Sequence, residues 1–129
     1  MTIHESSEDY LEAILRLTLE KGYARSVDVA YMLGVSKPSV SVAMSQLRKN
    51  GYIEMNETDH FLVLTPKGGS IASRIYERHT VLTELLCLLG VPEDTARTDA
   101  CKVEHDLSDI SFNAIKTALK RLKGKEKQD

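Results

Sequence analysis

Apolar residues recur at helical spacing along the chain and predict a mainly helical protein. The first predicted helix covers residues 8–22, with Ser6 or Ser7 as its N-cap and Gly22 as its stop. Its apolar side chains include the i, i+3, i+4 spacing of a buried face: Leu11, Ile14, Leu15, Leu17 and Leu19.

Two shorter helices are predicted next, over residues 25–35 and 36–51. Ser26 is the expected cap of the first, and Gly34 allows a sharp turn between the two. Ser36 stands before a proline in the first turn of the second helix. Two helices joined through a glycine-containing turn are typical of a helix-turn-helix.

A β-hairpin is predicted directly after these helices. Residues 52–55 and 61–65 are strand-like, and the polar segment 56–60 between them forms the loop. The order helix, helix, helix, hairpin is that of a winged helix.

The second half of the chain is predicted to be entirely helical. Residues 70–90 form a long helix that is apolar around much of its circumference, which fits either a buried interior or, as we favour, a dimer interface. Cys87 in this stretch is expected in the core. A further helix follows over 91–108, and a short amphipathic helix with a charged tail over 109–129. We therefore expect a mostly α protein, with a winged helix-turn-helix domain and small hairpin wing over 1–70 and an all-helical dimerisation domain over 71–129.

The overall composition is that of a globular protein, with 42% hydrophobic and 28% charged residues in 129. No apolar run approaches the roughly 18 residues that cross a bilayer, and the first ten residues do not resemble a secretory signal. Two cysteines do not suggest a disulfide framework. We expect a cytoplasmic protein with no membrane partner.

Charge is divided unevenly along the chain. Residues 21–53 carry five basic side chains and one acidic side chain, whereas residues 92–110 carry six acidic and two basic side chains. The first segment favours anions and the second favours cations.

The second helix of the helix-turn-helix carries candidate DNA contacts. Small hydroxyls and an amide can approach base edges, while lysine and arginine can hold phosphates. The candidates are Lys37, Ser39, Ser41, Ser45, Gln46, Arg48 and Lys49. An ordinary solvated helix face is the alternative, but the hairpin and local charge favour double-stranded DNA. A single reading helix per chain predicts a homodimer on a palindromic operator.

A thiol, a carboxylate and an imidazole stand together in the acidic segment. Cys101, Glu104 and His105 have the i, i+3, i+4 spacing that would place them on one helical face. Such donors suit a transition metal, although three unrelated residues would look the same. Further candidate ligands are Asp9 and Glu12, spaced i, i+3 on the first helix, and His79 on the long helix.

These residues resemble the diphtheria-toxin-repressor family, and more closely its short manganese-transport-regulator branch. The likeness runs over residues 6–110 and includes "SSEDYLEAIL", the helix-turn-helix, "LTPKG", "RH" before a leucine-rich helix, and "EH" before "LS". The resemblance implies a winged helix, a helical dimerisation domain, and a Mn2+ or Fe2+ corepressor bound where the domains meet. The positions that match the family's ligands are Asp9, Glu12, His79, Cys101, Glu104 and His105.

Departures from the family pattern concern the choice of metal. The manganese branch carries Glu where this chain has Cys101, while Asp9 and Glu12 resemble the manganese branch. Thiolate favours Fe2+, with Co2+ or Zn2+ possible in vitro, whereas carboxylates suit Mn2+. Thr83 and Arg97 stand where the iron branch has ligands of an ancillary site, so that site is expected to be absent.

The sequence thus predicts a metal-dependent transcriptional regulator, a repressor of metal-uptake genes, with no catalytic residues and no small-molecule substrate. One alternative is a metal-independent winged-helix repressor that responds to a small molecule or to thiol oxidation at Cys101. A metal hydrolase with Glu104 as base lacks a catalytic motif, and a purely structural dimerisation module leaves the basic helix unexplained.

Overall fold

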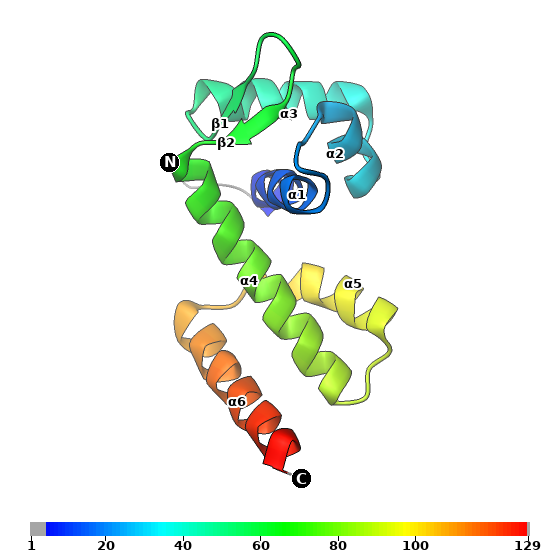
Figure 1. Cartoon of the computed structure of the whole chain (residues 1–129), viewed down its shortest axis with the longest axis vertical. Helices are drawn as coiled ribbons and strands as arrows, with labels where there is room; N and C mark the ends of the chain where they lie inside the picture. The colour runs from blue at the N-terminus through cyan, green and yellow to red at the C-terminus, as the bar shows by residue number, and fades with distance from the viewer. Residues whose placement is uncertain (1–4, 129) are drawn as a thin grey trace. The chain divides into compact units, whose positions relative to one another are not determined.

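The computed structural model describes residues 5–128, which form six helices and two strands (Figure 1). Two compact units divide the chain, Met1–Arg74 and Ile75–Asp129, and each is described by itself. Two expectations partly concern residues that lie outside the described ones. The judgement on a secretory signal includes residues 1–4, and the charged C-terminal tail includes residue 129. A mostly helical chain with one antiparallel hairpin after a helix-turn-helix confirms the predicted fold class.

The first two helices of unit 1 end as predicted but begin differently. Helix α1 covers Glu5–Lys21, so Ser6 and Ser7 lie inside it and neither is its cap. It stops at Gly22, whose φ of 84° only glycine adopts easily. Helix α2 covers Ser26–Leu33 with Arg25 at the N-cap, so the prediction of Ser26 as the cap is wrong. Ser26 already has helical backbone, and no side chain caps this end.

The turn between α2 and α3 follows the sequence signals closely. Gly34 has a φ of 65° and closes α2 through the carbonyls of Ala30 and Tyr31. Helix α3 covers Lys37–Lys49, and the Ser36 hydroxyl accepts the backbone N–H of Ser39 at 3.2 Å. The predicted helix-turn-helix is confirmed, and Ser36, expected only to stand before the proline of the first turn, is the N-cap of α3.

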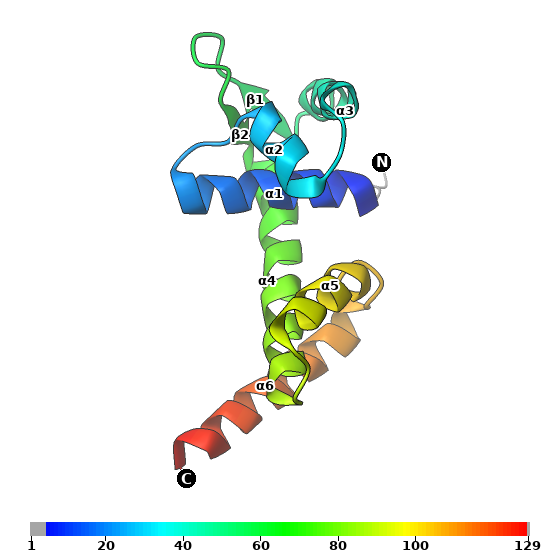
Figure 2. The same ribbon diagram turned by 90° about the vertical axis from the view of Figure 1, so that its right-hand side faces the viewer.

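Strands β1, Ile53–Met55, and β2, Leu62–Leu64, form the antiparallel hairpin. The loop between them extends beyond the helices of its unit (Figure 2). Its conformation is set by the Asn56 side-chain carbonyl, which accepts the backbone N–H groups of Thr58 at 2.8 Å and Asp59 at 3.3 Å.

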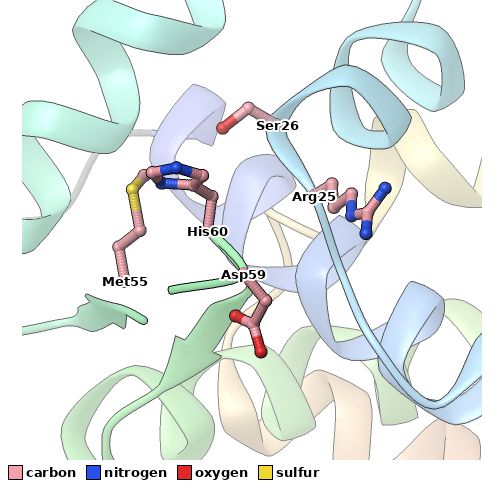
Figure 3. A pocket seen from close by; sticks show the side chains of 5 residues that line it. All are labelled: Arg25, Ser26, Met55, Asp59 and His60. Carbon is pink, nitrogen blue, oxygen red and sulfur yellow. The ribbon is translucent and has the colours of Figure 1, made fainter. Parts of the chain in front are cut away.

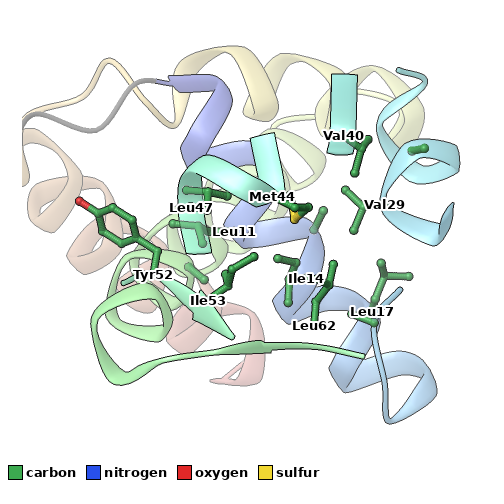
Figure 4. Close-up of a cluster of buried hydrophobic side chains, with 14 residues drawn as sticks. Leu11, Ile14, Leu17, Val29, Val40, Met44, Leu47, Tyr52, Ile53 and Leu62 are labelled. Atoms are coloured by element: carbon green, nitrogen blue, oxygen red, sulfur yellow. The ribbon is translucent and has the colours of Figure 1, made fainter. Parts of the chain in front are cut away.

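One hydrophobic core joins the helices and hairpin of unit 1 (Figure 4). Leu11 and Ile14 of α1 are fully buried, as is Val40 of α3. The core also takes in Leu17, Val29, Met44, Leu47, Tyr52, Ile53 and Leu62. Because Val40, Met44 and Leu47 fix one face of α3 against this core, its opposite face is held towards solvent.

Helix α4 covers Pro66–Leu88 and begins four residues before the predicted start at Ser70. The Thr65 hydroxyl accepts the N–H of Gly68 at 3.2 Å, which caps the helix, and proline is favoured in a first turn. Gly68 itself lies against hairpin backbone: a Cβ there would be 2.0 Å from the carbonyl oxygen of Tyr52. Gly68 thus marks a close approach to this backbone rather than a loop, whereas a Cβ at Gly69 would meet only Leu64 Cβ at 4.0 Å.

Unit 2 contains the rest of α4 together with α5, Glu93–Val103, and α6, Asp109–Gln128. Val81 of α4 packs with Phe112 and Leu119 of α6. Helix α6 has 20 residues and is longer than expected. Cys87 is exposed in this single chain, so its predicted core position is wrong. None of the described helices is long and apolar enough to cross a membrane.

Candidate metal centre and nucleic-acid interface

All seven predicted DNA contacts lie on the solvent side of α3. Lys37, Ser39, Ser41, Ser45, Gln46, Arg48 and Lys49 are each exposed. The helical spacing of the buried residues explains this exposure, since Val40, Met44 and Leu47 occupy the opposite face of α3. A helix with one apolar face in the core and a hydroxyl-rich, basic face in water has the chemistry to enter a DNA groove.

Two hollows lie beside the start of α2 and the hairpin, and the smaller one reaches α3. One, of about 500 Å³, is lined by Arg25, Ser26, Met55, Asp59 and His60 (Figure 3). The other, of about 190 Å³, shares Ser26 and Met55 and reaches the α3 residues Ser41, Ser45 and Arg48. Three of the predicted DNA contacts, Ser41, Ser45 and Arg48, therefore border a concave surface.

Arg25 adds positive charge beside these hollows, although sequence reasoning did not include it among the DNA contacts. Its guanidinium carbon lies 5.5 Å from the Tyr23 ring centre and 5.0 Å from that of Phe61. The two rings stack at 4.9 Å. This cation–π contact positions Arg25, and the signal available in the sequence was the pair of aromatic residues Tyr23, before α2, and Phe61, directly before β2.

A candidate metal cluster in unit 2 combines residues from α4 and from α5 with its C-cap. His79 lies on α4, Cys101 on α5, and Glu104 directly after α5. The His79 Nδ1 atom is 3.0 Å from Glu104 Oε2 and 3.6 Å from Cys101 Sγ. One ligand atom from each of the three side chains lies within 4.8 Å of the others. Residues that are 22 and 25 positions apart thus converge on one point.

Burial and charge make this cluster chemically unusual. Glu104 is 0% exposed and His79 is 8% exposed, while Cys101 lies at the surface. Among the described residues, no hydrogen-bond donor reaches Glu104 Oε1, and His105 Nε2 is 3.5 Å away from it. Cys101 and Glu104 together raise the pKa of His79 to about 10, since their hydrogen bonds and negative charge outweigh the effect of burial. A sulfur, nitrogen and oxygen set with a buried carboxylate oxygen that accepts no hydrogen bond from the residues described fits a divalent transition metal.

The helix that carries the thiol ends sooner than predicted. Helix α5 stops at Val103, so Glu104 and His105 do not lie within it. Glu104 keeps helical backbone as the C-cap, and its N–H bonds to the Ala100 carbonyl at 2.9 Å. Glu104 therefore keeps almost the position relative to Cys101 that it would have inside a helix. His105 lies in the following turn, where its side chain is 3% exposed.

Arg78 holds this turn in place, a role that sequence reasoning missed. It is 1% exposed and donates to the carbonyls of Glu104, at 3.2 Å, and Leu107. Its other end pairs with the exposed carboxylate of Asp109, and its guanidinium carbon lies 5.1 Å from the Phe112 ring centre. Arginine next to a candidate ligand histidine was the only available signal.

The two remaining predicted ligands belong to unit 1. Asp9 and Glu12 lie one helical turn apart on α1, with Asp9 half-buried and Glu12 4% exposed. Four of the six predicted metal ligands are thus in unit 2 and two are in unit 1.

Comparison with known families gives matches over both parts of the chain. Residues 2–61 match the N-terminal DNA-binding domain of the iron-dependent repressors. Residues 65–129 match their metal-binding and dimerisation domain.

Similar proteins include several manganese regulators. The transcriptional regulator MntR of Geobacillus kaustophilus is 44% identical over 110 residues, which are 85% of this chain and 75% of that protein. MntR of Salmonella typhimurium is 39% identical over 111 residues, 86% of this chain and 70% of that protein.

Solved structures agree with these matches. The crystal structure of T. acidophilum IdeR matches with a TM-score of 0.74 and 29% identity. The match covers 89% of this chain and 53% of the IdeR chain. The structure of the manganese regulator SloR matches with a TM-score of 0.77 and 26% identity, over 93% of this chain and 55% of the SloR chain. This chain therefore spans about half the length of these two solved proteins.

The fold and site define a winged-helix DNA-binding protein with a metal-binding, dimerising helical part. The chain belongs to the iron-dependent repressor family, the family of the diphtheria toxin repressor, and to its manganese-transport-regulator branch. It is a metal-dependent transcriptional regulator, and the predictions of DNA binding, a divalent metal and a homodimer are confirmed.

Proposed function

We propose that this protein represses metal-uptake genes by binding a two-fold symmetric operator as a homodimer when Mn2+ or Fe2+ is bound. Support comes from the manganese regulators to which it is similar and from the basic, hydroxyl-rich face of α3. Because its partner is chromosomal DNA, we place its action in the cytoplasm. We assign residues 1–70 to DNA binding and 71–129 to metal binding and dimerisation.

The observation that carries this proposal is the convergence of His79, Cys101 and Glu104. Their donor atoms gather within 4.8 Å although they come from separate helices. Thiolate favours Fe2+, Co2+ or Zn2+, while carboxylate oxygen also accepts Mn2+. His105, whose Nε2 atom lies 3.5 Å from Glu104, is a fourth donor in the same unit. We infer that these four side chains hold the ion.

We further propose that Asp9 and Glu12 of α1 complete the ligand set. The family resemblance supports this assignment, as does their spacing of one helical turn on a helix of the DNA-binding part. A bound divalent cation would supply the positive charge that offsets repulsion among the carboxylates. Asp9 and Glu12 would then couple the DNA-binding part to the dimerising part.

The free energy needed to couple metal binding to DNA binding can be stated. Shifting a two-state equilibrium from 1:99 to 99:1 takes about 5.5 kcal/mol of differential affinity. Structural zinc sites bind with about 10–16 kcal/mol, so a site of several charged ligands can supply this difference.

A regulatory role accounts for the cluster better than hydrolysis. A general base must reach its substrate or a water molecule, yet the Glu104 side chain is completely buried. We therefore propose that the protein has no enzymatic activity of its own.

The test is metal-dependent DNA binding by the full chain. A mobility-shift assay uses a duplex that the wild-type protein selects from random sequences in the presence of Mn2+. We expect EDTA to abolish the shift and Mn2+ or Fe2+ to restore it.

Glu104→Gln keeps the shape of the side chain and should remove metal stimulation. Glu93→Gln on the exposed start of α5 is the matched control and should behave as wild type. Equal DNA binding with EDTA and with metal would refute the proposed function.

A further inference from the structure

An apolar side chain stands at the centre of the exposed face of α3. Val42 is 59% exposed, whereas Val40, two residues earlier on the same helix, is completely buried. Two residues correspond to about 200° around an α-helix, so Val42 faces directly away from the core of unit 1. Val42 is not part of the hydrophobic core of unit 1.

The neighbours of Val42 on this face are predicted DNA contacts. Ser39 precedes it by three residues, while Ser45 and Gln46 follow it by three and four. Positions at these intervals lie next to each other on a helix surface, and all three side chains are exposed. Any duplex that these polar side chains touch must also cover Val42.

The chemistry of valine restricts what it can recognise there. Its side chain has neither donor nor acceptor, so phosphates and the polar base edges gain nothing from it. The major groove presents one apolar group, the C5 methyl of thymine. Burying a branched apolar side chain against that methyl removes both from water.

We propose that Val42 is a specificity-determining residue that reads a thymine methyl group in each half-site of the operator. This inference rests on the proposed function, since it requires α3 to enter the major groove. It adds an apolar contact to a helix face on which the seven predicted DNA contacts act through hydrogen bonds or charge. The chain then prefers thymine over cytosine and over uracil at that position.

The experiment replaces thymine by uracil, which deletes only the methyl group and keeps base pairing. Each thymine of the selected duplex is replaced in turn, symmetrically in both half-sites, and affinity is measured by fluorescence anisotropy with Mn2+. We expect one position at which the wild-type protein loses about fourfold in affinity for each methyl removed, equivalent to about 0.8 kcal/mol for one buried apolar carbon.

Val42→Ala supplies the second arm of the test. Its affinity should no longer depend on thymine or uracil at that position, while its response to Mn2+ and EDTA stays that of wild type. Val27→Ala on α2, 49% exposed but outside α3, is the control and should keep the full preference for thymine.

The outcomes separate this inference from the proposed function. The inference is overturned if no thymine matters to the wild-type protein, or if Val42→Ala keeps the same preference while binding DNA in a metal-dependent way. Loss of metal-dependent binding in the wild-type protein itself would refute the proposed function instead.

Discussion

His79 is a proposed metal ligand whose protonation would control when the ion can bind. Cys101 and Glu104 raise its pKa to about 10, so the imidazole of the metal-free chain keeps its proton at neutral pH. A ligand histidine must be deprotonated, so proton and metal compete for this nitrogen. The ordinary pKa of histidine is 6.5, so a free imidazole would already be deprotonated at neutral pH. For His79 the proton is lost, and its competition with the metal ends, only as the pH approaches about 10.

We therefore predict that Mn2+ affinity rises by about tenfold per pH unit between roughly pH 7 and 9, as one proton is displaced for each ion. Isothermal titration calorimetry in two buffers with different ionisation enthalpies measures both the affinity and the protons released. An affinity that stays flat over this range, with no proton released, would contradict the assignment of His79 as a ligand.

In the proposed ligand set, Cys101 is the residue that we expect to set the choice of metal. Its sulfur is the only soft donor in the predicted set, and the other donors are oxygen or imidazole nitrogen. We predict that Cys101→Glu lowers the response to Fe2+ relative to Mn2+ in the mobility-shift assay, because a carboxylate replaces the thiolate. Cys87→Ser tests the effect of losing the other exposed thiol and should leave the ratio unchanged. An unchanged ratio in Cys101→Glu would refute the softness argument.

Among the elements, α4 depends most on one close approach. Gly68 lies where a Cβ would be 2.0 Å from the carbonyl oxygen of Tyr52, which itself accepts the N–H of Thr65 at 3.1 Å. Gly69, the next residue, leaves room, since its nearest atom is Leu64 Cβ at 4.0 Å. Adjacent glycines in one helix thus have opposite requirements.

We predict that Gly68→Ala destabilises the protein by about 3 kcal/mol, because backbone must move to admit the methyl group. Gly69→Ala should instead be neutral or stabilise it by up to about 1 kcal/mol, as alanine favours a helix. Urea unfolding followed by circular dichroism measures both. Equal effects from the two substitutions would show that the contact with Tyr52 carries no weight.

The elements differ in how well the sequence predicts them. Gly34 and Ser36 act on their own neighbours, so the turn between α2 and α3 was predictable from local chemistry. The start of α4 was not, since Gly68 and Gly69 look like a loop until the Tyr52 backbone is placed beside them. Ser26 failed as a cap because Arg25 already supplies the extended residue before α2.

For the molecule as a whole, the central question is whether one ion joins the two parts of the chain. Glu12 belongs to unit 1 and Glu104 to unit 2. If both hold the same ion, removing either carboxylate charge should have the same consequence for DNA binding, although only Glu12 lies near the helix-turn-helix in sequence.

We predict that Glu12→Gln abolishes metal-stimulated DNA binding as completely as Glu104→Gln does, and that the double variant is no worse. Glu20→Gln, at an exposed position on the same helix, should respond to Mn2+ as wild type does. The measurement is DNA affinity with Mn2+ and with EDTA, next to the thermal midpoint without metal as a check of folding. Additive losses in the double variant would mean that the two carboxylates act on separate sites.

The candidate site was only partly visible in the sequence. The spacing of Cys101 and Glu104 and the family resemblance named the ligands, and the structure brings three of them together. Arg78 and Val42 were missed for opposite reasons. A buried arginine is explained only by the distant carbonyls it binds, and an exposed valine only by the helix face that turns it outward.

The position of Cys101 at the surface, beside a buried His79 and Glu104, exposes the site to oxidants. Peroxide would convert an accessible thiolate to a sulfenic acid, and the sulfur would no longer be a good ligand. A relative with a carboxylate at this position would have no such weakness. Purification in air should therefore yield molecules with reduced metal stoichiometry, and a thiol reductant should restore it.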